Sequence, residues 1–290
     1  MPEDPQFERR PEVGVEPPHS LEPVVPRPPT NRPPEWFPLP PVPSPPRDPV
    51  WSGGDVVLIA LLTIVTLVAA ELVVAAGAWA FFYRNADYRS LLQRPSLDLL
   101  GQVLGYVAVA AFMIFLVEGK YSVPFWKAIH WNWNPRSIPK WLGLGVLTVG
   151  IDLLGRYLPL PKSSPFEQFF AHRSDALLMA IFAVTFGPLM EELIFRGFLY
   201  PVLARWAGVT AAVLLTAIPF GLLHYLQYRS WSAVLLITLV GVVLTVVRAW
   251  TNSVSASFLV HVGYNGTLMA LAAVATDGFR HMEKAALVWP

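Results

Sequence analysis

The chain contains no cysteine, which excludes disulfides, zinc–thiolate sites and thiol nucleophiles. Charge is scarce as well: Asp, Glu, Lys and Arg make up 14% of the 290 residues, whereas a soluble domain carries about 25%. The net charge is +1, so electrostatics give no basis for nucleic-acid binding. Residues 1–50 also lack an apolar core, and we expect no cleavable signal peptide there.

Hydrophobic residues are abundant instead, at 54% of the chain. They gather in stretches close to the roughly 20 residues that cross a bilayer, so we predict an all-α, polytopic bundle of transmembrane helices in a lipid bilayer. The segment 161–175 could hold one further short helix, which leaves seven or eight helices open. The predicted spans are 55–83, 98–117, 141–158, 176–206, 209–228, 232–250 and 252–275.

Proline divides the chain into two parts. Residues 1–50 hold 18 of the 29 prolines, and proline removes backbone donors and favours extended conformations. We therefore predict a disordered, Pro-rich tail over 1–50 and a transmembrane helical domain over 51–290. The role of the tail stays open.

Ionisable residues interrupt the fourth apolar stretch. Glu191, Glu192 and Arg196 lie there, and each such residue near a helix centre costs about 2.5–3.5 kcal/mol. Glu192 and Arg196 are four residues apart, which favours an ion pair on one helix face. Glu191 points about 100° away and has no basic residue at either helical spacing. The pair explains insertion of the helix, but it does not explain Glu191.

Two later stretches repeat the four-residue spacing. Phe220 precedes His224 in one, and His261 precedes Asn265 in the other. Glu191 lies as far before the turn near 207–208 as His224 lies after it, which places both roughly 25 Å from that turn. The same counting places His261 within about 4 Å of their plane. We therefore predict that Glu191, His224, His261 and Asn265 face one cavity.

Two further acids, Asp152 and Glu71, lie in the predicted spans. Asp152 and Arg156 have the same four-residue spacing, and we expect a structural ion pair. Glu71 stands alone in the first span and has no explanation from the sequence.

The ordered motifs Glu191-Glu192-x-x-x-Arg196, Phe220-x-x-x-His224 and His261-x-x-x-Asn265 resemble those of the CAAX prenyl protease type II family, the ABI or CPBP group of intramembrane endopeptidases. The resemblance covers about 176–270, the expected protease core. It implies a hydrolase that cleaves a peptide or a membrane protein.

The resemblance also implies roles for the residues. Glu191 would be the base that activates water, with His224 sharing the task, and His261 and Asn265 would stabilise the oxyanion. Glu192 and Arg196 would order the helix, with Phe220 as a further supporting residue. The same four polar residues, Glu191, His224, His261 and Asn265, would be the ligands if the enzyme used zinc. The absence of an H-E-x-x-H pattern favours the metal-free version, and the cofactor stays open.

Two other classes of function compete with proteolysis. A non-catalytic scaffold or immunity-type binding protein would not need Glu191 and His224, and both are present. A proton-coupled transporter would use Glu191 and the histidines as a relay, but the sequence has no internal repeat with broken helices. We expect a multi-pass protein of the bacterial inner membrane. The substrate and the cleavage site cannot be derived from the sequence.

Overall fold

The computed structural model describes residues 48–160 and 164–282, and within these ranges the chain forms helices and no strand. Within the described ranges, seven helices are long and apolar enough to cross a membrane, which confirms the all-α, polytopic prediction. They are Gly53–Phe81, Pro95–Lys120, Pro135–Tyr157, Arg173–Ala207, Val209–Tyr228, Trp231–Thr251 and Val254–Ala275. Nearly all of the predicted tail lies outside the described residues.

Several spans consist of more than one element. The first is α1 (Gly53–Phe81) and the second is α3 (Pro95–Phe115) with the π-helical η1 (Leu116–Lys120). The third combines η2 (Pro135–Ser137), α5 (Ile138–Thr148) and the 3₁₀-helix η3 (Val149–Tyr157). The fifth is α9 (Val209–Leu223) with α10 (Tyr225–Tyr228), and the last two are α11 (Trp231–Thr251) and α12 (Val254–Ala275). Short helices α2 (Tyr88–Leu91), α4 (Phe125–Ala128) and η4 (Pro165–Phe170) lie between spans.

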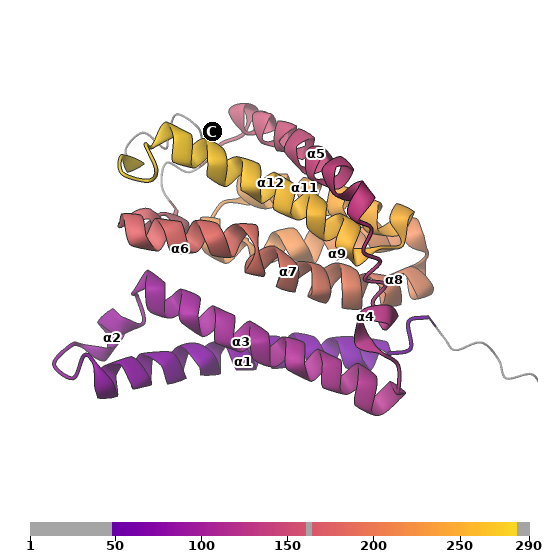
Figure 1. The fold of residues 1–290 in the computed structure, drawn as a ribbon, viewed down its shortest axis with the longest axis horizontal. Helices are drawn as coiled ribbons and strands as arrows, with labels where there is room; N and C mark the ends of the chain where they lie inside the picture. The colour runs from indigo at the N-terminus through magenta and orange to yellow at the C-terminus, as the bar shows by residue number, and fades with distance from the viewer. Residues whose placement is uncertain (1–47, 161–163, 283–290) are drawn as a thin grey trace, which may run out of the picture. The chain divides into compact units, whose positions relative to one another are not determined.

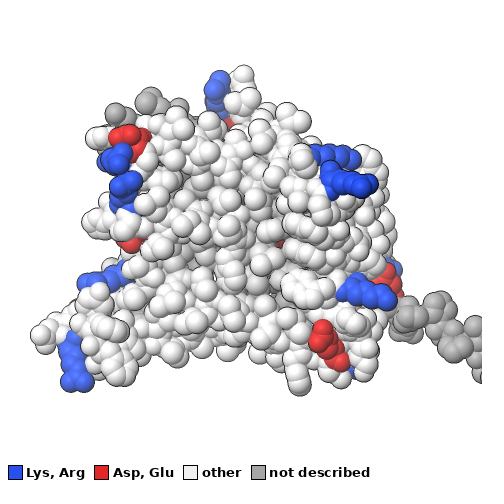
Figure 2. Space-filling model, in the orientation of Figure 1, with Lys and Arg blue, Asp and Glu red and all other residues white. Residues whose placement is uncertain are grey.

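Three pairs of long helices make the largest contacts, of which α1 with α3 and α9 with α11 are antiparallel and α5 with α12 is parallel. Helix α1 lies along α3, α5 lies along α12 and α9 lies along α11 (Figure 1). Figure 2 shows charged side chains mostly toward the margins of the visible face, with a largely uncharged surface between them. This distribution is typical of a protein whose middle zone contacts lipid chains.

Two glycines allow α12 to approach α5 closely. A Cβ atom at Gly145 would lie 2.2 Å from the carbonyl oxygen of Val260, and one at Gly263 would lie 2.4 Å from that of Leu142. Small residues permit such backbone contact between membrane helices. The contact fixes the part of α12 that carries His261.

The fourth span, expected as one helix over 176–206, is broken. Its parts are α6 (Arg173–Val184), α7 (Phe186–Glu192), the π-helical η5 (Leu193–Leu199) and α8 (Tyr200–Ala207). The break lies at Thr185, with φ −118° and ψ −78°. Pro188 explains it, because proline has no N–H to donate to the carbonyl of Val184 and its ring disturbs the preceding turn.

The expected pair between Asp152 and Arg156 is wrong. Both residues are described and no ion pair joins them; Tyr264 donates to Asp152 Oδ1 at 3.1 Å instead. The reason is the 3₁₀-helical η3, in which residues three apart share a face and residues four apart do not.

Candidate functional site

The polar residues of the fourth span lie where α7 enters η5. Glu192 ends α7 and is fully buried, and Arg196 lies in η5 with no exposed surface. Arg196 Nη1 donates to Glu192 Oε1 at 2.9 Å, so the predicted pair is present. A π-helical turn inside an α-helix is rare and is frequently found at functional sites.

All three nitrogens of the Arg196 guanidinium group donate hydrogen bonds. Besides Glu192, it donates to the carbonyl of Gly241 at 2.9 Å and to Thr245 Oγ1 at 3.2 Å, both on α11. Its guanidinium carbon lies 4.3 Å from the centre of the Phe220 ring. A buried charge is tolerated when it is paired and hydrogen-bonded in this way.

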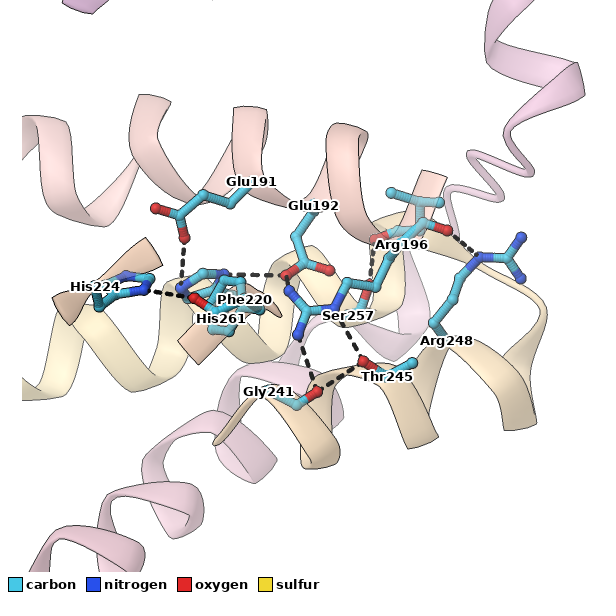
Figure 3. Close-up of polar contacts among 11 residues, drawn as sticks. Glu191, Glu192, Arg196, Phe220, His224, Gly241, Thr245, Arg248, Ser257 and His261 are labelled. Atoms are coloured by element: carbon cyan, nitrogen blue, oxygen red, sulfur yellow. Dashed lines mark hydrogen bonds and ion pairs between the residues drawn. The ribbon is translucent and has the colours of Figure 1, made fainter. Parts of the chain in front are cut away.

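His261 lies between the two glutamates. Its Nδ1 is 3.1 Å from Glu192 Oε1, and its Nε2 is 3.6 Å from Glu191 Oε2 (Figure 3). The Glu191 side chain is 25% exposed, whereas that of Glu192 is 0% exposed. Because Glu192 Oε1 is a carboxylate oxygen already bound by Arg196, we assign the donor role to Nδ1 of His261. The other ring nitrogen, Nε2, faces Glu191.

His224 is the C-cap residue of α9 and is held by that helix. Its Nδ1 lies 2.8 Å from the carbonyl oxygen of Phe220, which only accepts, so Nδ1 carries the proton and Nε2 has the lone pair. The Phe220 ring lies 5.1 Å from the ring of His224 and 5.9 Å from that of His261. The Phe220 ring thus contacts both imidazoles.

Asn265 makes a different contact. Its Nδ2 donates to the carbonyl oxygen of Ala183 at 2.7 Å, one turn after His261 on α12. Among the described residues, no hydrogen bond or ion pair joins Asn265 or His224 to Glu191. The structure brings Glu191, Glu192 and His261 into contact, and it places His224 beside them through Phe220.

The sequence prediction missed the contribution of α11. Gly241 and Thr245 hold Arg196, and Arg248, which is 2% exposed, donates from Nε to the carbonyl of Arg196 at 3.1 Å. One sequence feature could have indicated this contribution, because Arg248 is an arginine inside an apolar stretch. Its position near the end of that stretch, however, is also typical of an arginine that reaches the membrane surface.

The donor types at this site suit zinc, because carboxylate and imidazole are its usual ligands. Both histidines also bind a protein acceptor through Nδ1, as metal-bound histidines do. Across 48–160 and 164–282, however, no three His, Asp or Glu side chains lie close enough together to hold one ion.

Part of the chain is similar to known proteins. Residues 173–267 match the model of the family described as "Type II CAAX prenyl endopeptidase Rce1-like". An "Uncharacterized 24.3 kDa protein" of Escherichia coli is 27% identical over 166 residues, which cover 54% of this chain and 73% of that protein. No solved structure matches the chain significantly. At family level the match supports a CAAX-type intramembrane protease. The resemblance that the three motifs predict is confirmed over residues 173–267, a segment that contains every residue predicted for the site.

Proposed function

We propose that this multi-pass membrane protein is an intramembrane endopeptidase, in which water activated by Glu191 hydrolyses a peptide bond. One observation carries the proposal: the partly exposed carboxylate of Glu191 faces Nε2 of His261 at 3.6 Å, inside a segment long and apolar enough to span a membrane. Such a carboxylate is expensive in a bilayer, and a function that needs it accounts for its presence.

The reaction begins when Glu191 takes a proton from water. The water oxygen attacks the scissile carbonyl carbon and forms a tetrahedral intermediate, whose oxygen carries the negative charge. The intermediate then collapses, the C–N bond breaks, and Glu191 returns the proton to the leaving amine. His224 shares the first step, because the lone pair at its Nε2 can orient the same water.

His261 and Asn265 stabilise the oxyanion in this proposal. With both ring nitrogens protonated, His261 donates from Nδ1 to Glu192 and from Nε2 to the oxyanion. Asn265 uses one amide hydrogen on Ala183 and keeps the other for the substrate. Glu192 and Arg196 hold His261 in place and do not touch the substrate.

Zinc remains part of the proposal as a second mechanism. Glu191, His224, His261 and Asn265 would have to move closer together to hold the ion, and a bound zinc would then supply Lewis acidity toward water and the carbonyl. The steps above do not depend on it. We propose a bacterial inner membrane as the location, since the chain has seven candidate spans among its described residues and a relative in Escherichia coli, and a peptide or a membrane protein as the substrate.

The test is a cleavage assay on the full chain in detergent and in liposomes. Internally quenched peptides, with and without a prenylated C-terminal cysteine, are compared for wild type and Glu191→Gln. We expect Glu191→Gln to lose activity by about 10²–10⁴-fold, because an amide cannot take a proton from water. Asp87→Asn is the matched control, since Asp87 is exposed and its side chain does not cap α2.

Three outcomes would change the proposal. Equal cleavage by wild type and Glu191→Gln would remove Glu191 as the base. Silencing by a zinc chelator, with recovery on added zinc, would select the metal mechanism and make Glu191 a ligand. A wild type that binds peptides and never cleaves them would favour the non-catalytic binding protein.

A further inference from the structure

Two carbonyl groups of the π-helical η5 accept hydrogen bonds from side chains outside their own helix. Arg248 Nε on α11 donates to the carbonyl of Arg196 at 3.1 Å. Trp51 Nε1, two residues before α1, donates to the carbonyl of Phe198 at 2.9 Å. Both donors are buried, Trp51 at 0% and Arg248 at 2% exposed. Two distant parts of the chain thus hold one helical segment.

Each donor is itself held firmly. Arg248 Nη1 donates to Asn252 Oδ1 at 2.6 Å, and Asn252 Nδ2 lies 3.1 Å from His130 Nδ1. Nε2 of His130 in turn lies 3.0 Å from Asp48 Oδ2. This connected set reaches from the junction with the N-terminal segment to the backbone of Arg196.

Trp51 is fixed from two sides. Its ring stacks on Phe198, with centroids 4.6 Å apart and planes 1° from parallel. Arg205 on α8 donates to the carbonyls of Pro49 at 2.5 Å and Trp51 at 3.0 Å. The Trp51 N–H therefore meets the carbonyl of Phe198 in one orientation only.

A π-helical segment needs such support. It contains one residue more than the α-helix of the same rise, and one α-helical residue corresponds to a rotation of about 100°. Phe198 and Val202 belong to the same buried cluster as Trp51, Met113 and Met190. If η5 relaxed to α-helix while Phe198 and Val202 stayed packed in this cluster, the rotation would fall on the part that carries Met190, Glu191 and Glu192. Glu191 would then leave Nε2 of His261.

We propose that Arg248 and Trp51 are positioning residues for the site, which hold η5 in its π-helical form and thereby keep Glu191 against His261. The effect on catalysis rests on the proposed peptidase function, whereas the effect on η5 does not. Neither residue touches the reacting atoms.

The experiment uses two conservative variants of the full chain. Trp51→Phe keeps an aromatic ring on Phe198 and removes only the N–H donor. Arg248→Lys keeps the charge and removes the planar group that joins Asn252 to the carbonyl of Arg196. Trp206→Phe, on a tryptophan 79% exposed in α8, and Arg156→Lys, on an exposed arginine of η3, are the controls.

Two readouts are measured, kcat and KM for peptide cleavage and hydrogen–deuterium exchange of the amides in 193–200. We expect kcat to fall by up to about 100-fold with KM unchanged, because small displacements of a catalytic group have effects of this size. We also expect faster exchange in 193–200 and unchanged exchange in α12. The two control variants should match wild type in both readouts.

Unchanged kcat and unchanged exchange in both variants would overturn the proposal. A fall in kcat with exchange in 193–200 as in wild type would also overturn it, because the residues would then act by another route. If Arg248→Lys fails to fold, kcat and the exchange in 193–200 of Trp51→Phe alone decide whether the proposal holds. If wild type cleaves no peptide, the proposed function fails, and the exchange measurement still decides whether Arg248 and Trp51 hold η5.

Discussion

The polar cluster has two ends that use similar residue types in opposite ways. At the closed end, which we define as Glu192, Arg196, Gly241 and Thr245, the guanidinium donors of Arg196 meet acceptors and the two charged side chains are fully buried. At the open end, defined as Glu191, His224 and Asn265, the carboxylate is 25% exposed and an imidazole nitrogen is left without a partner among the described residues. His261 touches both ends through its two nitrogens.

The difference shows how neighbouring residues can be assigned to structure and to chemistry. Glu191 and Glu192 are adjacent, but one helical residue turns their side chains about 100° apart. Glu192 points at Arg196 and His261 in the interior, where a paired charge has little freedom to react. The side chain of Glu191 is instead partly exposed, at 25%. We therefore expect substitutions at the closed end to affect stability and those at the open end to affect activity.

Replacing Glu192 should have the largest effect on stability. Glu192→Gln leaves Arg196 buried without its counter-charge, and removing one partner of a buried pair costs about 3–5 kcal/mol. The free energy of unfolding, measured by SDS titration in mixed micelles, should fall by that amount. Glu191→Gln is the control, and we expect it to stay within about 0.5 kcal/mol of wild type. A larger loss for Glu191→Gln than for Glu192→Gln would reverse the assignment of the two ends.

Much of this contrast could be predicted from the sequence. The spacing of Glu192 and Arg196 predicts their pair, and the partnerless Glu191 predicts a separate role. Counting residues from the helix turns places Glu191 and His261 at similar depth. In the structure, Glu191 Oε2 lies 3.6 Å from His261 Nε2. These predictions use only helical geometry, which holds over short distances along a chain.

The remaining features depend on contacts between helices, which one sequence does not reveal. The link from His261 to Glu192 joins α12 to α7, and the hydrogen bonds of Arg248 and Trp51 join α11 and the start of α1 to η5. The π-helical η5 and the 3₁₀-helical η3 have no sequence signature that separates them from an α-helix. For this reason the expected pair of Asp152 with Arg156 is wrong.

The close contact of α12 with α5 should have the next largest effect. A methyl group at Gly263 would lie 2.4 Å from the carbonyl of Leu142, so Gly263→Ala forces the helices apart. Overpacking of this kind costs about 1–3 kcal/mol. Cleavage should also fall, because α12 carries His261 and Asn265. A displaced α12 would move both residues away from Glu191 and Glu192. Gly143→Ala is the matched control on α5, since a Cβ atom there meets nothing within 4 Å.

His224 tests the open end with a smaller effect on stability. His224→Gln removes the hydrogen bond from Nδ1 to the carbonyl of Phe220, which contributes about 1 kcal/mol. The loss of Nε2 should lower kcat of peptide cleavage by about 10²-fold. Unfolding and kcat are measured on the same preparation. A loss of stability near that of Glu192→Gln, with cleavage retained, would place His224 in the closed end.

The smallest effect should come from Arg156, although the sequence pairs it with an intramembrane acid. The side chain of Arg156 is exposed, and Asp152 receives its hydrogen bond from Tyr264 because η3 is 3₁₀-helical. Arg156→Gln should therefore leave the free energy of unfolding within about 0.5 kcal/mol of wild type. Tyr264→Phe on the same acid should cost about 1 kcal/mol, since it leaves an oxygen of Asp152 without its donor. If Arg156→Gln is the more damaging of the two, the segment is α-helical in the membrane and the pair expected from the sequence forms there.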